Sequence, residues 1–223
     1  MKSLIMLGGG IDSTVLLYML KASGIELHGL FVDFGKDLNK GKNSVLWFCD
    51  KLKIPLEIVN FEMSQLHKPE EDSRNWKFYP GFGMILMTIA AGVADKNGCT
   101  SIYSGEYDAL EEKIKPEDTH ETNWSYSSKR IIYDCNTLAF QEMLALYRKL
   151  YSLNRMQISF PFIGFSQADV IKLGVKLEVA LSETMSCGNS DCSIHCGFCV
   201  KCQERKQAFK GAKERDFTEY EFV

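Results

Sequence analysis

Residues 4–17 read Leu4-Ile-Met-Leu-Gly-Gly-Gly-Ile-Asp-Ser-Thr-Val-Leu-Leu17, and the rest of the chain is organised around them. The stretch begins as an apolar run of strand length, breaks at three consecutive glycines, and continues with apolar residues at helical spacing. Asp12, Ser13 and Thr14 at the junction are all types that can cap a helix N-terminus. A strand, a glycine turn and a capped helix form a phosphate cradle, because backbone N–H groups and the helix dipole point at an anion there. An ordinary tight β–α turn is the alternative. The predicted phosphate-binding residues are Gly8, Gly9, Gly10, Asp12, Ser13 and Thr14.

The glycine turn does not match the two commonest nucleotide motifs. The lysine of G-x-x-x-x-G-K-[ST] is missing, and G-x-G-x-x-G does not fit. Gly-Gly-Gly-Ile-Asp-Ser instead resembles Ser-Gly-Gly-x-Asp-Ser of the PP-loop ATP pyrophosphatases, which cleave ATP between its α- and β-phosphates and adenylate a substrate. Gly8 stands where that family usually has serine, which removes one hydroxyl donor from the pyrophosphate site.

Length and composition limit the class of protein. The chain has 223 residues, of which 45% are apolar, enough for the core of one α/β domain or of a domain with a small appendage. A net charge of −3 and a pI near 5.9 argue against a free-standing nucleic-acid binder. No apolar run reaches membrane-spanning length and residues 1–7 are too short for a signal peptide, so we expect a cytoplasmic protein without a membrane partner. Eight cysteines then indicate metal or thiol chemistry rather than disulfides.

Strand and helix patterns alternate along the chain. We predict further strands at 26–34, 56–61, 100–106 and 158–163, and helices at 43–53, 81–94, 137–152, 166–174, 177–181 and 201–213. This alternation favours a parallel sheet. Residues 62–79 are predicted to form a loop. The polar segment 107–133 predicts a lid or an insertion, and its His120 is expected to be solvated rather than a ligand.

The second predicted strand ends in Val32-Asp-Phe-Gly-Lys36. Ligands of parallel sheets bind at the carboxyl ends of the strands, so Asp33 and Gly35 are expected beside the glycine turn. We predict that both contact the nucleotide. The alternative is a strand-terminal turn that carries no ligand.

Four cysteines near the C-terminus follow the pattern C-x8-C-x2-C-x2-C. Two C-x2-C pairs let thiolates reach one ion from a tight turn, and four thiolates close a tetrahedral zinc site. A redox pair, free thiols and a [4Fe–4S] cluster are the alternatives. Cys192 is left over, while three cysteines in apolar settings are expected to be packing residues: Cys49, Cys99 and Cys135. The predicted zinc ligands are Cys187, Cys196, Cys199 and Cys202.

The glycine motif and the cysteine motif, at this separation and chain length, look like the 7-cyano-7-deazaguanine synthase family, known as QueC or ExsB. Residues 32–36 resemble its Asp-Tyr-Gly-Gln, Tyr133-Asp-Cys-Asn136 with Phe140 resembles Pro-Asp-Cys-Arg…Phe, and residues 160–174 resemble its Thr-Pro-Leu…Lys-Ala-Glu-Ile…Leu-Gly. The resemblance covers nearly the whole chain apart from residues 107–132.

The resemblance implies a doubly wound five-stranded α/β fold over residues 1–175, with a zinc-bound helical extension over residues 176–223. It also implies ATP with Mg²⁺ and the substrate 7-carboxy-7-deazaguanine. In that family the carboxylate is adenylated, ammonia gives an amide, and a second activation gives the nitrile. Asp12 and Ser13 are then the predicted catalytic residues, with Ser13 helping to hold the departing pyrophosphate. A guanine-like edge offers N–H donors, so its pocket needs acceptors such as carboxylates. The alternative is that the carboxylates available in this chain are solvated surface charges. The predicted substrate-binding carboxylates are Glu106, Asp108 and Asp134.

The chain departs from the family pattern at three further points. Phe82 replaces an arginine, Gln167 replaces a lysine, and the insertion at 107–132 has no counterpart. These changes predict a diverged relative that stops at an amide. The alternative acceptor is a protein amine. This alternative comes from QueC-like proteins of antiviral operons, some of which are thought to join a deazaguanine to a protein amine. A tRNA-thiolating enzyme and a non-catalytic nucleotide- or deazaguanine-binding protein are the competing hypotheses. Family relatives are often dimers, so a homodimer is the expected assembly.

Overall fold

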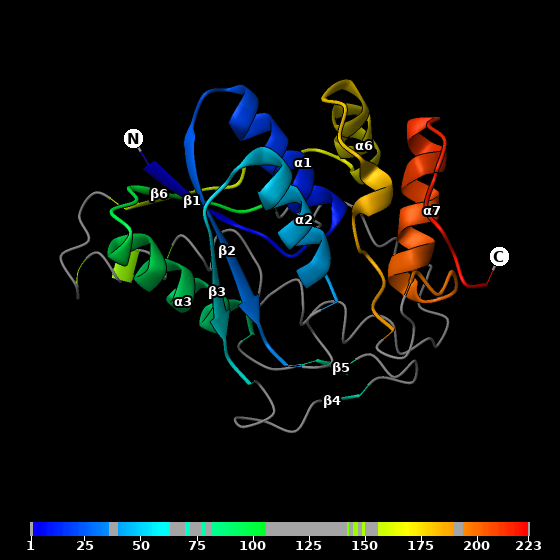
Figure 1. Ribbon diagram of the computed structural model, residues 1–223. Coiled ribbons are helices and arrows are strands. Elements are labelled where there is room, and N and C mark those ends of the chain that lie inside the picture. Colours follow the sequence, from blue (N-terminus) through cyan, green and yellow to red (C-terminus); the bar gives the residue numbers. More distant parts are fainter. Residues whose placement is uncertain are drawn as a thin grey trace.

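The structure is a computed structural model that describes residues 2–35, 40–62, 70–71, 77–78, 82–105, 156–189 and 194–222, together with residues 142, 145, 146 and 149, which are helical. Five parallel strands form its central sheet in the order β3-β2-β1-β6-β7 (Figure 1). The strands are β1 Lys2–Met6, β2 Glu26–Asp33, β3 Leu56–Asn60, β6 Ser101–Tyr103 and β7 Gln157–Ser159. The predicted five-stranded parallel sheet is confirmed.

The strand order reverses next to β1. The chain runs outward from β1 to β2 and β3, and then returns to place β6 and β7 on the other side of β1. Connections on the two sides of such a point leave a crevice at the carboxyl ends of the strands, where open α/β sheets bind their ligands. The glycine turn follows β1 and Gly105 follows β6, so both lie at this point.

Helices cover both faces of the sheet, as the doubly wound fold requires. On one face lie α1 Ile11–Ala22, α2 Lys42–Leu52, α6 Gln167–Lys176 and α7 Val200–Ala212 (Figure 1). The other face carries α3 Phe82–Lys96. Successive residues of β1 point to opposite faces: Ile5 packs in the cluster with Val15 of α1, whereas Leu4 packs with Met87 of α3.

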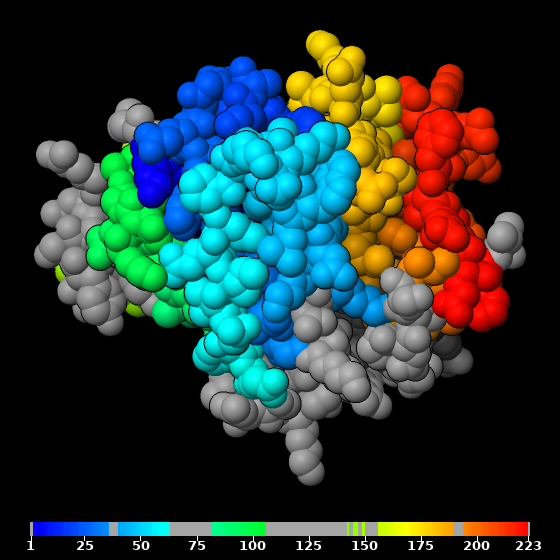
Figure 2. Space-filling view, viewed as in Figure 1, coloured from blue at the N-terminus to red at the C-terminus, as the bar shows by residue number. Residues whose placement is uncertain are grey.

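The C-terminal extension shares the core of the sheet domain. Phe209 of α7 and Ile171 of α6 are buried in the same hydrophobic cluster as Val15 of α1. Figure 2 shows the C-terminal residues, in red, directly against the orange and yellow residues that precede them. Burial of this shared apolar surface stabilises the extension, so its folding depends on the sheet domain.

Most predicted elements agree with the structure to within about three residues at each end, the usual uncertainty of boundaries read from sequence. Strand 158–163 was too long, because the chain turns at Phe160: the N–H of Ile163 donates to its carbonyl at 3.2 Å. Phe162 is fully buried inside that turn. The turn is therefore as apolar in sequence as a buried strand, which is why the prediction extended the strand through it. Strand 100–106 was also too long, since β6 ends at Tyr103.

Three further differences concern helices and short strands. The predicted helix at 177–181 was wrong: a 3₁₀ turn, η4 Leu181–Glu183, follows α6 instead. The helix predicted to end at Gly174 continues to Lys176, and its start was right, since Ser166 and Asp169 form a capping box. Within the predicted loop 62–79 lie two antiparallel two-residue strands, β4 Glu70–Glu71 and β5 Lys77–Phe78.

Candidate functional site

The glycine turn connects β1 to α1, and the N-terminus of the helix carries no side-chain cap among the described residues. Gly10 occupies the N-cap position in an extended conformation, and no side chain of the described residues caps the helix there. The prediction that Asp12, Ser13 or Thr14 caps α1 was therefore wrong, because all three lie inside its first turn. The first N–H groups of a helix without a cap need another acceptor, and an anion supplies one.

The two hydroxyl groups of the first turn bind the loop itself. Thr14 Oγ1 donates to the Gly10 carbonyl at 2.7 Å, and Ser13 Oγ accepts from Gly8 N at 3.3 Å. The Ser13 hydroxyl thus lies on the side of the loop where the Gly8 amide is exposed. This places Ser13 where an incoming anion would meet it.

Gly9 and Gly8 differ in what the fold demands of them. Gly9 has a φ of +80°, and a Cβ there would collide with the backbone of Gly41, at the start of α2. Glycine is required at position 9 for both reasons. A Cβ at Gly8 would have nothing within 4 Å, and its φ is not in the left-handed range. The missing serine at position 8 is therefore no consequence of packing.

The end of β2 lies beside the glycine turn, as predicted. The Asp33 carboxylate accepts from Gly35 N at 3.2 Å with one oxygen and from Lys42 Nζ at 2.8 Å with the other. Lys42 directly follows Gly41, which packs on the glycine turn, so the ion pair connects the two strand ends. Sequence reasoning missed Lys42, because nothing in its local pattern indicates a partner on another strand.

Asp12 lies within electrostatic range of charged residues in the first two turns of α7. Protein surrounds most of its carboxylate, and this burial raises its pKa to about 6 against the attraction of Lys201. Glu204 also raises the pKa, whereas Arg205 lowers it. On its other side the Asp12–Ser13 peptide is in close contact with Gly105, where a Cβ would lie 2.9 Å from Ser13 N. The first turn of α1 thus contacts the end of β6 and lies within electrostatic range of the C-terminal extension.

An aromatic cluster surrounds Phe82, at the position where the family resemblance leads us to expect an arginine. Phe82, the first residue of α3, lies 4.5 Å from Phe34 between ring centroids, and Phe34 lies 6.2 Å from Phe61. These rings pack at the ends of β2 and β3. The other replaced residue, Gln167, is the first residue of α6. The predicted substrate carboxylates Glu106, Asp108 and Asp134 lie outside the described residues, as do Lys36, the insertion and His120.

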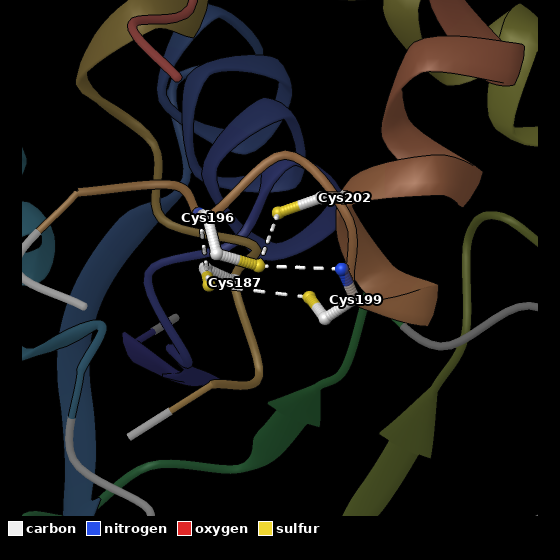
Figure 3. Close-up of side chains that lie close together, drawn as sticks. All are labelled: Cys187, Cys196, Cys199 and Cys202. Carbon is white, nitrogen blue, oxygen red and sulfur yellow. Dashed lines mark hydrogen bonds between the residues drawn. The ribbon is translucent and has the colours of Figure 1, made fainter. Parts of the chain in front are cut away.

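The four predicted zinc ligands come together in one cluster (Figure 3). Their sulfur atoms all lie within 4.8 Å of one another. Two sulfur pairs, Cys187–Cys199 and Cys196–Cys202, are 3.9 Å apart. Four sulfurs at about 2.3 Å from a tetrahedral zinc ion would be separated by about 3.8 Å, so the cluster fits one zinc ion. The separations exceed a disulfide bond, and a [4Fe–4S] cluster would need room for four iron atoms between the sulfurs.

Backbone N–H groups point at two of the sulfurs. Cys187 Sγ accepts from Asn189 N and Cys196 N, each at 3.4 Å, and Cys196 Sγ accepts from Cys199 N at 3.2 Å. Burial alone would raise the pKa of Cys196, but hydrogen bonds from the Cys199 and Phe198 N–H groups and from the neighbouring thiols outweigh it and lower the pKa to about 7. Burial keeps the pKa of Cys187 and Cys202 above the usual value, which a bound cation would offset.

The described cysteines outside the cluster, and the histidine beside it, have structural roles. Cys49 and Cys99 are buried, and burial raises the pKa of Cys49 to about 11, as expected of packing residues. His195 accepts from Ser186 N at 3.0 Å, and burial lowers its pKa to about 4, so the neutral imidazole fastens the metal loop. Cys135 and Cys192 lie outside the described residues.

Residues 2–213 match the family described as "Queuosine biosynthesis protein QueC". The chain belongs to the QueC family. A 7-cyano-7-deazaguanine synthase of Methanococcus aeolicus is 29% identical over 99% of this chain and 99% of its own length. The 7-cyano-7-deazaguanine synthase of Methanoregula boonei is 28% identical over 99% of this chain and all of its own.

Among solved structures, a predicted subunit of a tRNA methyltransferase from Methanocaldococcus jannaschii is similar with a TM-score of 0.47 and 16% identity. The match covers 78% of this chain and 74% of that chain. A likeness at this level says nothing about activity. Within the part of the chain that the structure describes, no helix is long and apolar enough to cross a membrane.

Proposed function

We propose that this QueC-family protein is an ATP-dependent ligase that adenylates 7-carboxy-7-deazaguanine, releases pyrophosphate, and transfers the acyl group to a nitrogen nucleophile. The observation that carries the proposal is the uncapped glycine turn at the reversal of the sheet, in a chain whose full-length relatives are named 7-cyano-7-deazaguanine synthase. A carboxylate is a poor electrophile until one of its oxygens becomes part of a good leaving group, and AMP is such a group. ATP cleaved between its α- and β-phosphates supplies it.

The phosphate side of ATP would lie on the glycine turn. The N–H groups of Gly9 and Gly10 and of the first turn of α1 would donate to the leaving pyrophosphate, and the Ser13 hydroxyl, which accepts from Gly8 N, would lie beside them. The Thr14 hydroxyl donates to the Gly10 carbonyl and would hold the turn itself. Donors fixed by the fold need no rearrangement when charge develops on the leaving oxygens. Asp33 and Gly35, at the adjacent strand end, would contact the nucleoside part.

Among the described residues, we assign Asp12 as the carboxylate that would hold Mg²⁺ beside the phosphates. Carboxylate oxygens are the ligands that Mg²⁺ prefers, and the pKa of Asp12 at about 6 leaves it ionised at neutral pH. Mg²⁺, when bound with ATP, offsets the negative charge of the phosphates. The zinc ion would be structural, bound by Cys187, Cys196, Cys199 and Cys202 with no open position for a substrate. We assign the sheet domain to residues 1–175 and the metal-binding extension to residues 176–223.

The deazaguanine would bind beyond the carboxyl end of β6. Glu106 follows Gly105 directly in sequence, and Gly105 packs on the Asp12–Ser13 peptide. With Asp108 and Asp134 it would accept the N–H donors of the guanine-like edge. We propose these three carboxylates as the acceptors.

The reaction is proposed to end at an amide. Nitrile formation needs a second adenylation, in which a neutral amide oxygen attacks ATP. That nucleophile is weaker than a carboxylate, so the step depends more on stabilising the pyrophosphate. Gly8 supplies no hydroxyl there, and Phe82 is packed against Phe34 where an arginine is expected. These losses favour the amide, with a protein amine as an alternative acceptor to ammonia.

Product analysis tests the proposal. The protein is incubated with ATP, Mg²⁺ and 7-carboxy-7-deazaguanine, with and without ammonia, and the nucleotides are separated by chromatography. AMP and pyrophosphate that appear only with the acid support it, whereas ADP and phosphate refute it. Calorimetric binding of ATP and the acid without turnover, whichever amine is offered, would favour a non-catalytic binding protein. Binding of bulk tRNA that persists at physiological salt would favour the tRNA-thiolating alternative.

A further inference from the structure

The carbonyl of Gly9 is bound from the side of the C-terminal extension. It accepts from Met185 N at 2.8 Å, and Ser44 Oγ lies 3.1 Å from it. Ser44 Oγ also lies 2.6 Å from the Glu183 carbonyl oxygen. Ser44 is buried on α2, so the glycine turn, α2 and residues 183–185 meet at one point away from solvent.

The segment that contacts Gly9 leads directly to the metal centre. Cys187, the first cysteine of the cluster, comes two residues after Met185. Between them, Ser186 N donates to the buried His195, which precedes the second cysteine, Cys196. A displacement of the metal loop would therefore move Met185, whose N–H donates to the Gly9 carbonyl.

Arg205 of α7 binds the same segment, residues 181–186, through several hydrogen bonds. Its guanidinium is almost completely buried and donates to the Leu181 carbonyl at 2.7 Å, Thr184 Oγ1 at 2.9 Å and Ser186 Oγ at 3.0 Å. Thr184 Oγ1 in turn donates to the Leu181 carbonyl at 2.6 Å. A planar guanidinium with several donors in a fixed geometry holds such a segment more rigidly than one hydrogen bond would.

We infer that Arg205 and Thr184 are positioning residues for the nucleotide loop: they hold residues 181–187 so that Met185 and Ser44 fix the Gly9 carbonyl. Neither residue touches the proposed ATP site. The inference rests on the proposed binding of ATP at the glycine turn. Its consequence is that affinity for ATP depends on how residues 181–187 are held, and that bound ATP protects the metal loop in return, since coupling between two sites is reciprocal.

Two threonines provide a matched test, because both accept a hydrogen bond from the guanidinium of Arg205. Thr184 lies in the segment that contacts Gly9, whereas Thr218 lies in the C-terminal tail and accepts from Arg205 Nε at 2.8 Å. Thr184→Val and Thr218→Val remove the same hydroxyl and preserve the side-chain shape. Only the first removes a contact to the segment that holds the loop.

The dissociation constant of Mg²⁺-bound α,β-methylene-ATP is measured by calorimetry for both variants, with zinc content checked by elemental analysis. We expect Thr184→Val to raise this constant about tenfold with zinc retained, because the variant loses a buried hydroxyl that accepts from the charged Arg205 and donates to the Leu181 carbonyl. Thr218→Val should change it less than about twofold, since thermal stability and not the loop would be affected. Hydrogen exchange of a peptide covering residues 7–17 should be faster only in Thr184→Val.

Dissociation constants that stay at the native value in both variants, or that rise equally in both, would overturn the inference. Either result would leave the proposed function intact. A native protein that does not bind the analogue would overturn both. A second readout is zinc release to a chromogenic chelator, which the analogue should slow in the native protein and in Thr218→Val, and slow less in Thr184→Val. Protection of the same extent in all three proteins would also contradict the coupling.

Discussion

Replacing Gly8 by serine should increase the rate of AMP formation. The position has room for a side chain, since a Cβ at Gly8 would meet nothing within 4 Å and the backbone φ is outside the left-handed range. The added hydroxyl would lie beside Ser13 Oγ, which is 3.3 Å from Gly8 N, at the proposed pyrophosphate site. Loss of one preorganised donor costs about a hundredfold or more in kcat in buried sites, so we expect a gain of about tenfold at this exposed one.

The assay follows AMP formation from ATP with the acid in excess, together with mass spectrometry of the deazaguanine product. Gly8→Ala is the matched control, because it adds the same Cβ and restricts the backbone equally but supplies no donor. We expect Gly8→Ser to exceed both Gly8→Ala and the native protein, and to increase the nitrile fraction. Equal nitrile fractions in the serine and alanine variants with ammonia present would refute the reasoning that a missing hydroxyl limits the second activation, and equal rates of AMP formation would refute its role in the first.

Three further changes test the site from different sides. Gly9→Ala should abolish binding of α,β-methylene-ATP in calorimetry, because the new Cβ collides with Gly41 and the φ of +80° is unfavourable for alanine; unchanged affinity would contradict the described loop. Cys196→Ser should remove zinc and leave the protein insoluble or strongly destabilised, since metal binding contributes to folding; soluble, folded protein without metal, or iron in the native protein, would count against the zinc site. Burial raises the pKa of Asp12 to about 6, so the folded state binds this proton more tightly than the unfolded chain does, and the contribution to stability is lost as pH rises from about 4 to about 6. The difference in unfolding free energy between Asp12→Asn and the native protein should therefore shift in favour of the variant over that range, while Mg²⁺-dependent AMP formation by the native protein rises through about pH 6. A native rate that is flat between pH 5 and 7 would contradict a role for ionised Asp12.

The features that the sequence predicted well are local in the chain. The glycine turn, the strand before it and the helix after it lie within residues 2–22, where apolar spacing and glycine follow directly from backbone sterics. The cysteine spacing predicted the cluster because a metal site closed by C-x2-C turns depends on short-range geometry. The capping box of α6 was likewise readable from four consecutive residues, Ser166 to Asp169.

What the sequence did not predict is non-local. Ser44 approaches the Glu183 carbonyl oxygen across 139 positions of the chain, and no local pattern marks a buried serine as a bridge. Arg205 lies on the buried face of α7, three residues after Cys202 and four before Phe209, but helical spacing does not show that its guanidinium binds residues 181–186. The ends of β6 and β7 were also missed, because packing rather than propensity decides where a buried apolar run turns.

The most direct test of acyl adenylation is the fate of carboxylate oxygen. 7-Carboxy-7-deazaguanine labelled with ¹⁸O in both carboxylate oxygens is incubated with ATP, Mg²⁺ and ammonia, and AMP and the deazaguanine product are examined by mass spectrometry. Attack of the carboxylate on the α-phosphorus followed by amine attack on the acyl carbon must leave one labelled oxygen in AMP. We predict labelled AMP together with an amide that keeps the second ¹⁸O. Unlabelled AMP, or label in inorganic phosphate with ADP, would contradict the proposed reaction.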